Sequence, residues 1–178
     1  MSWLQFWSLG LLAVAGLTQA SDNGGGAGDF DFLIGAWNVH SRYLKGRLQG
    51  SREWIEFEGR SEMRPLSHGL GNIDQYTFLR EGKQIDGVAF RLWNPAGRQW
   101  AIYWADSITP GVIQPPVFGS FNGDAGEFIG EDTFNDKKIL CRFRWTRSVS
   151  PRWEQSFSGD GGKTWETNWI MTFARAKP

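Results

Sequence analysis

The chain has 178 residues, with 19 basic and 19 acidic side chains, 23 glycines and 15% aromatic residues. This length suits a single domain, and the balanced charge argues against nucleic acid as a partner. The glycine and aromatic content, without a collagen-like repeat, indicates a β-rich globular domain.

The first 20 residues carry no charged side chain and are mostly apolar from Trp3 to Leu17. They end in Thr18-Gln19-Ala20, a small-x-small pattern that predicts a signal peptide over residues 1–20. The apolar run is shorter than the ~20 residues of a spanning helix, so a retained membrane anchor is the less favoured alternative. We therefore expect a periplasmic or secreted protein without stable membrane insertion.

A glycine-rich stretch predicts a flexible linker over residues 21–29, followed by a β-barrel domain over residues 30–175. In this domain apolar residues alternate at period two in short runs, as in strands with one buried face. The predicted strands are 35–44, 51–63 with a bulge at Gly59, 72–80, 85–93, 98–106, 112–121, 127–134, 138–147, 152–158 and 164–175.

Short turns, such as Asn94-Pro95-Ala96-Gly97 and Asn122-Gly123-Asp124, join these runs as hairpins do. About ten antiparallel strands in up-and-down order protect their edges best by closing into a barrel, and a closed barrel encloses a cavity. The prediction is an all-β, closed, antiparallel up-and-down barrel. In its last strand Trp165, Thr167, Trp169, Met171 and Phe173 should share one face, and Glu166, Asn168 and Thr172 the other.

Three segments carry a family resemblance: Phe30-Asp31-Phe32-Leu33-Ile34-Gly35-Ala36-Trp37, Trp100-Ala101-Ile102-Tyr103-Trp104-Ala105-Asp106, and the region from Trp153-Glu154-Gln155 to Trp165. Together they resemble a family of uncharacterised bacterial calycin-like domains, related in architecture to lipocalins and fatty-acid-binding proteins. The resemblance covers residues 30–175. It implies a barrel with an internal cavity, and it implies no activity and no catalytic residue.

Residues 158–165 match the Asp-box pattern, Ser-x-Asp-x-Gly-x-Thr-Trp. Sialidases and other propeller proteins carry several such boxes, but this chain has one and no longer repeat. The pattern describes a hairpin in which Asp160 caps backbone N–H groups and Trp165 packs beneath. We interpret it as a structural turn.

The chain has one cysteine and two histidines, so it can form no intrachain disulfide and offers few metal ligands. Cys141 is expected to be a buried hydrophobe. His40 and His68 lie far apart in sequence, and a zinc site needs three or four converging ligands. No metal and no cofactor are therefore predicted, with a haem held by one axial histidine as a minor alternative.

Charged residues on the strands are mostly assigned to the outer face. Glu56 and Glu58 are two apart, about 6.5–7 Å, which approaches the carboxyl spacing of inverting glycosidases, but a solvated face is the favoured interpretation. Arg142 and Arg144 should also point outward, although fatty-acid-binding relatives turn an arginine inward to hold a carboxylate.

The leading hypothesis is an exported barrel that binds a small apolar or aromatic molecule in its interior, with Gln155 orienting the ligand. The residues expected to contact the ligand are Trp104, Trp145, Trp153, Gln155 and Trp169, whereas Trp37 and Trp165 should plug the barrel ends.

Two other functional classes remain open. An isomerase, cyclase or hydrolase would need an inward carboxylate of raised pKa, for which Asp106 and Asp132 are the candidates. A sugar-binding protein would instead present coplanar, exposed tryptophans. The oligomeric state is left open.

Overall fold

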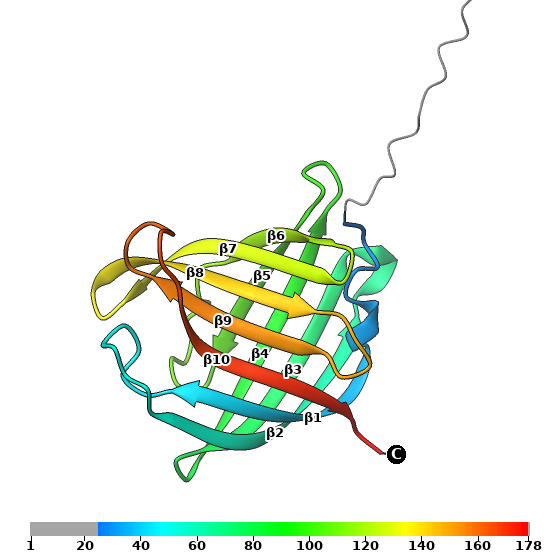
Figure 1. Cartoon of the computed structure of the whole chain (residues 1–178). Coiled ribbons are helices and arrows are strands. Elements are labelled where there is room, and N and C mark those ends of the chain that lie inside the picture. The colour runs from blue at the N-terminus through cyan, green and yellow to red at the C-terminus, as the bar shows by residue number, and fades with distance from the viewer. Residues whose placement is uncertain (1–24, 178) are drawn as a thin grey trace, which may run out of the picture.

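The computed structural model describes residues 25–177 and is a closed barrel of ten antiparallel strands (Figure 1). Each strand pairs with its neighbours in sequence, and the last strand pairs with the first. The predicted fold class is thereby confirmed. The strands are β1 (Gly35–Leu44), β2 (Trp54–Pro65), β3 (Gly71–Arg80), β4 (Lys83–Asn94), β5 (Gln99–Asp106), β6 (Val117–Asn122), β7 (Ala125–Phe134), β8 (Lys137–Thr146), β9 (Arg152–Ser158) and β10 (Glu166–Arg175).

The described helices are two short 3-10 turns, η1 (Asp31–Leu33) and η2 (Ser67–Gly69). Within residues 25–177 no helix has the length and apolar character needed to cross a membrane. The predicted signal peptide over residues 1–20 lies outside the described residues. Of the predicted linker, residues 25–29 are described, and the Gly26 N–H donates to the Asp29 carboxylate at 2.8 Å.

The strand predicted over residues 112–121 is wrong in its first half. Residues 107–116 form a loop, and β6 begins only at Val117. Pro115 and Pro116 have no N–H to donate to a strand partner, which explains why pairing fails there. As a result β5 and β6 share three paired positions, the shortest ladder in the barrel.

The predicted bulge at Gly59 is also wrong, because the β1–β2 register continues through Gly59 without a shift, and the β2–β3 ladder begins at this residue. A Cβ at this position would lie 2.5 Å from the ring of Tyr76. Glycine is therefore needed for close approach of an aromatic ring. The irregularity in the barrel is instead a register shift in β10 between Thr167 and Trp169.

This bulge changes the face of Asn168, which the sequence pattern placed outside. An extra residue in one strand resets the alternation of side chains. Asn168 is fully buried, with 0% of its surface exposed. Trp165 lies before the start of β10 and packs on the barrel exterior, its ring 4.1 Å from the Arg142 guanidinium carbon, so the prediction that it plugs a barrel end is wrong.

One end of the barrel, called here the capped end, is closed by η1 and its neighbours (Figure 1). Phe30 is 0% exposed and meets the rings of Trp100 and Phe121 edge-on, at 5.0 and 5.1 Å between centroids. The Trp37 indole is buried, and its N–H donates to the Leu33 carbonyl at 2.7 Å. Trp37 thus packs under the cap.

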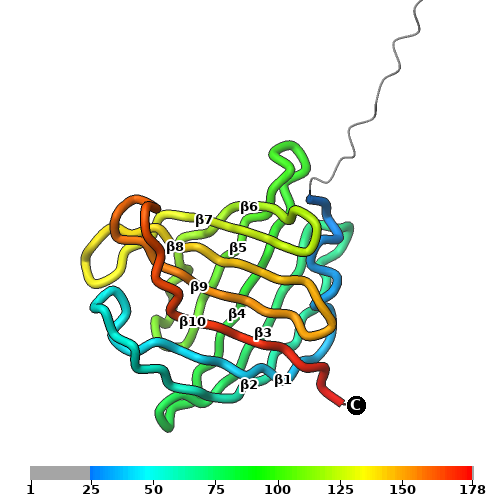
Figure 2. The backbone as a smooth tube through the Cα atoms, viewed as in Figure 1, coloured from blue at the N-terminus to red at the C-terminus, as the bar shows by residue number. Residues whose placement is uncertain are grey.

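The other end, called here the open end, carries the connections after β1, β3, β5, β7 and β9. Figure 2 shows the β1–β2, β7–β8 and β9–β10 loops gathered there, opposite η1 and the C-terminal end of β10. The longest of these connections are residues 45–53, residues 107–116 and residues 159–165. No equivalent of η1 closes this end among the described residues.

Candidate binding cavity

A cavity of about 310 Å³ occupies the open half of the barrel. This volume is at the lower end of what small-molecule sites in proteins enclose, roughly 300–1,000 Å³. The lining comes from inward positions of most strands and from residues 107–116. The cavity is therefore built by the strand alternation, and its mouth by the loops of the open end.

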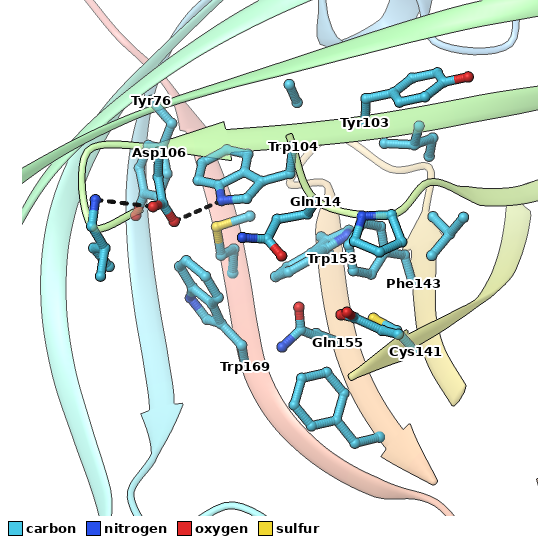
Figure 3. Close-up of a pocket in the computed structure, with 18 of the residues that line it drawn as sticks. Tyr76, Tyr103, Trp104, Asp106, Gln114, Cys141, Phe143, Trp153, Gln155 and Trp169 are labelled. Atoms are coloured by element: carbon cyan, nitrogen blue, oxygen red, sulfur yellow. Dashed lines mark hydrogen bonds between the residues drawn. The ribbon is translucent and has the colours of Figure 1, made fainter. Parts of the chain in front are cut away.

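Four tryptophans line the cavity, and Figure 3 shows three of them, Trp104, Trp153 and Trp169. The rings of Trp153 and Trp169 meet edge-on, with centroids 5.6 Å apart. Phe143 contacts the other side of Trp153 at 4.9 Å. Trp153 and Trp169 are therefore held by neighbouring rings, which leaves flat apolar surfaces facing the space.

Trp104 lies against the wall because the opposite strand has a glycine. A Cβ on Gly87 would lie 2.1 Å from the Trp104 ring. The indole N–H donates to the Asp106 carboxylate at 2.9 Å (Figure 3). Gly87 on β4 and Asp106 on β5 thus fix the orientation of this ring and keep the cavity open.

Asp106 lines the cavity but uses both carboxylate oxygens within the protein. One oxygen accepts from Trp104, and the other accepts from the backbone N–H groups of Ile108 and Thr109 at 3.0 and 3.1 Å. An aspartate with these partners caps the start of a loop. Its role is to shape residues 107–116 at the mouth.

Gln155 provides a polar group on the β9 side of the cavity. Its amide N–H donates to the Asn168 carbonyl oxygen at 2.8 Å. This bond fixes the amide, and Figure 3 shows the Gln155 oxygen directed into the cavity, toward Gln114. The bulge in β10 places Asn168 for this contact, so an irregularity in one strand orients an acceptor on the next.

The floor of the cavity contains a buried ion pair. The Arg91 guanidinium donates to the Asn72 side-chain oxygen at 3.0 Å and to the Asp74 carboxylate at 3.3 Å. Ser61 donates to the other Asp74 oxygen at 2.6 Å. Burial lowers the pKa of Arg91, while the Asp74 charge opposes that shift. A buried charge is tolerable only with such partners.

Arg91 also contacts aromatic rings, at 5.1 Å from Phe30 and 5.6 Å from Trp145. These cation–π contacts join the polar floor to the cluster of the capped end. Trp145 is 3% exposed and lines the cavity as well. It therefore forms the boundary between the packed half and the hollow half of the barrel.

The carboxyl of Asp132 has a pKa that its position in the cavity shifts. It lines the cavity on β7, and burial raises its pKa, opposed by a hydrogen bond from the Thr133 N–H and by the charge of Arg47. Cys141 lines the same wall, and burial raises the pKa of its thiol. A thiol in this state is a weak nucleophile, consistent with its predicted role as a buried hydrophobe.

The structure brings together all of the side chains predicted to contact a ligand. The cavity is lined by Trp104, Trp145, Trp153, Gln155 and Trp169, and also by Asp106 and Asp132. That these residues bind a ligand remains a prediction, since position alone does not establish it.

The residues assigned to the outer face lie there. The His40 ring hydrogen-bonds with Glu58 at 2.7 Å and lies 3.6 Å from Glu56. His68 lies in η2 and is exposed. Neither histidine lines the cavity, so the haem alternative lacks an axial ligand inside the barrel. In residues 25–177 no three His, Cys, Asp or Glu side chains cluster as a metal site would require.

Arg142 and Arg144 also lie outside, near Glu127. In the Asp-box hairpin, Asp160 accepts hydrogen bonds from the Thr164 hydroxyl and backbone N–H, and these bonds lower its pKa. This is the predicted structural turn. None of the nine tryptophans after residue 20 is in the exposed class, which leaves the sugar-binding alternative without its predicted platforms.

The sequence pattern did not identify four charged residues of the lining. These are Asp74 and Arg91 at the floor, and Arg47 and Arg80 at the mouth. Arg91 could have been assigned inward, because it lies on the same face of β4 as Ile85, Ala89 and Trp93. Arg47 carries no such signal, because it lies in a loop.

No model of a known protein family and no curated protein matches the sequence. Among solved structures, the S-type phycobiliprotein lyase CPES from Guillardia theta is similar, with a TM-score of 0.53. The match covers 84% of this chain and 91% of that chain, at 12% sequence identity. At this identity the likeness shows the fold alone. The closed barrel and this neighbour are compatible with a calycin-like domain.

Proposed function

We propose that this chain is an exported protein that binds a small, largely apolar or aromatic molecule inside the open half of its barrel. The observation that carries the proposal is the cavity of about 310 Å³ enclosed by Trp104, Trp153 and Trp169. Apolar surface of this extent favours a ligand that is itself apolar, and the Gln155 oxygen supplies one acceptor to orient it.

Binding can be tested with 1-pyrenebutanol, a neutral aromatic probe that accepts excitation energy from tryptophan. Tryptophans line the cavity, so a bound probe should quench their emission and emit in turn. Ala89 lines the cavity, and Ala89→Phe should fill it and abolish the signal. The matched control is Ala101→Phe, on the outward side of β5, which should bind as the wild type does.

Absence of energy transfer to the wild-type protein would contradict the proposal. Equal binding by the Ala89→Phe and Ala101→Phe proteins would contradict the location, because the probe would then sit outside the barrel. Circular dichroism and thermal melting of both variants establish that each is folded.

Export is a separate part of the proposal and needs its own measurement. The small-x-small pattern at Thr18-Gln19-Ala20 supports cleavage after Ala20. Expression of the full chain in a Gram-negative host, followed by fractionation and mass spectrometry, should give a periplasmic or secreted protein beginning at Ser21. A chain that keeps residues 1–20 and stays with the membrane fraction would favour the anchor instead.

A second candidate function, an isomerase, cyclase or hydrolase, is favoured by Asp132. This carboxyl lines the cavity and burial raises its pKa, which is the property a general acid requires. Small molecules that remain bound through native purification should be identified by mass spectrometry and incubated with the protein. Turnover that Asp132→Asn abolishes while binding persists would support catalysis; an unchanged ligand would exclude it for that molecule.

A further inference from the structure

Two arginines stand at the mouth of the cavity on either side of one tyrosine. Arg47 comes from the β1–β2 loop and Arg80 from the end of β3, and both line the cavity. Their guanidinium carbons lie 4.9 and 4.5 Å from the centroid of the Tyr43 ring. Tyr43 therefore holds two like charges close together at the entrance.

Arg47 also reaches toward the far strands. Its guanidinium carbon lies 4.5 Å from the Phe134 ring and 5.3 Å from the Phe157 ring. These rings end β7 and β9, whereas Arg47 starts from the β1 side. The arginine is held over the opening by three rings, which presents its donors at the mouth in a fixed position.

Neither guanidinium contacts a carboxylate among the described residues, although the charges of Asp132 and Glu166 act on Arg47 from a longer distance. No ion pair and no side-chain hydrogen bond joins Arg47 or Arg80 to another residue of the part of the chain that the structure describes. Two acidic residues of the neighbouring loops, Glu53 and Glu81, have carboxylate oxygens 3.0 and 3.9 Å from the Lys45 ammonium instead. The loops of the open end thus pair Lys45 and leave both arginines without a carboxylate in direct contact.

Partial burial and mutual repulsion make the two guanidinium charges unfavourable as long as no anion is bound. Burial lowers the pKa of Arg47, and the positive charge of Arg80 lowers it further, while Glu166 and Tyr43 oppose the shift. A second hollow beside the mouth is lined by Arg47, Lys137, Lys138 and Asp160, so its charged lining is positive on balance. An incoming anion would neutralise charges that the fold has partly removed from water.

We propose that the cavity binds an aromatic or apolar carboxylic acid, whose body lies between Trp104, Trp153 and Trp169 and whose carboxylate is bound by Arg47 and Arg80 at the mouth. This proposal rests on the proposed function, since the arginines can anchor a ligand only if the cavity admits one. Guanidinium groups bind carboxylates through two parallel N–H donors. The chemistry of the mouth thereby adds an acidic group to the ligand class.

A carboxylate fits this mouth better than a phosphate does. Phosphate sites usually add backbone N–H groups at a helix N-terminus or in a glycine-rich turn. Among the described residues the helical turns are η1 and η2, and both lie at the capped end. The glycine-rich turn of the open end, residues 159–162, donates the N–H groups of Asp160 and Gly162 to the Ser158 hydroxyl within the hairpin. The rim consists of aromatic rings and the planar guanidinium groups of Arg47 and Arg80. These groups suit a planar carboxylate, whose single negative charge has a low desolvation cost.

The test compares 1-pyrenebutyrate with 1-pyrenebutanol, which differ only in the terminal group. The wild-type protein should bind the carboxylate more tightly by about tenfold, as expected for a charged hydrogen bond at a partly buried site. Arg47→Gln and Arg80→Gln should each remove most of this preference, by lowering the affinity for the carboxylate much more than the affinity for the alcohol. Arg60→Gln, an exposed residue on the outward side of β2, is the matched control and should keep the preference.

Each outcome decides a different point. If neither probe binds the wild-type protein, the proposed function fails, and this inference fails with it. If both probes bind equally well, or if the Arg47→Gln, Arg80→Gln double variant keeps the preference, the carboxylate site is wrong while the cavity stands. Tighter binding of the pyrenebutyl phosphate monoester than of the carboxylate would also overturn the assignment.

Thermal melting establishes that the variants are folded. Should a glutamine variant fail to fold, Arg47→Lys and Arg80→Lys keep the charge but remove the two-donor fork. They should then retain a reduced preference for the carboxylate, and an undiminished preference would contradict recognition by the fork.

Discussion

The two ends of the barrel are built from the same aromatic residue types, but they differ in what fills the space between the strands. At the capped end Phe30, Trp100 and Phe128 are each 0% exposed, and the Phe30 ring meets Trp100 edge to face and Phe128 at an angle of 30°. At the open end Trp104 and Trp169 are only partly buried and border a cavity. The residues that form the solid core and the residues proposed to bind a ligand therefore lie in opposite halves of the barrel.

The cause of the difference is local. Residues 25–33 enter the capped end and insert Phe30 between strands, which completes a solid core. At the open end, Gly87 lets the Trp104 ring lie along the wall, and Asp106 fixes it there. Aromatic rings contribute stability where other rings meet both faces, and they are available to a ligand where one face stays free.

The largest expected effect is at the capped end. Trp100→Ala should lower the free energy of unfolding by about 4–5 kcal/mol, because a fully buried indole is replaced by a void. Urea denaturation measures this loss. A loss below about 1 kcal/mol would contradict the description of this end as the solid core.

The next effect tests the boundary between the halves. Asp74→Ala leaves the Arg91 charge buried with Asn72 as its remaining polar partner, and should cost about 3 kcal/mol in urea denaturation. The double variant Asp74→Leu, Arg91→Met removes both charges and should recover most of this loss. If the double variant is no more stable than Asp74→Ala, the cost is not that of an unpaired charge.

A smaller effect is expected at the open end, and on binding more than on stability. Trp169→Leu should weaken binding of 1-pyrenebutanol by about tenfold, because one wall of the cavity is lost, and should cost less stability than Trp100→Ala. Trp165→Leu, on the exterior, is the matched control and should bind normally. Equal binding by both variants would contradict the proposal that the probe binds in the cavity of the open end.

The smallest effect concerns pH. Burial raises the pKa of Asp132 above its ordinary value of 3.8. A raised folded-state pKa contributes stability below the unfolded-state value, and this contribution is lost as pH rises through the folded-state pKa. At about pH 7 the ionised carboxylate therefore destabilises the fold, and Asp132→Asn should melt at a higher temperature than the wild type.

This difference should shrink as the pH falls toward about 4 and below, where wild-type Asp132 is protonated. Thermal melting of both proteins across this range is the measurement. A variant that melts below the wild type at neutral pH would show that Asp132 has favourable partners and is no candidate for a general acid.

The sequence predicted the barrel because alternation at period two is a local property that each strand carries by itself. The same alternation placed Trp104, Trp153 and Trp169 correctly. It failed at residues 112–116, where Val112 and Ile113 have high strand propensity but two prolines prevent strand pairing. It failed at Asn168 because a bulge depends on the partner strand, which no local pattern contains.

The charged part of the cavity was harder to predict for a different reason. Arg91 shares its face of β4 with Ala89 and Trp93, which favours an inward side chain, but Phe90 and Leu92 make the opposite face apolar as well, so the signal is weak. Arg47 lies in a loop, where no alternation assigns a direction. Its position became clear only from the rings of β7 and β9 that hold it.

The central claim is that the open half of the barrel is hollow and accessible. The most direct measurement is anomalous diffraction from a crystal of the protein soaked with 1-bromopyrene. We predict a bromine peak inside the barrel, between Trp104, Trp153 and Trp169. Bromine peaks confined to the outer surface, around an interior filled by the protein's own side chains, would contradict the account.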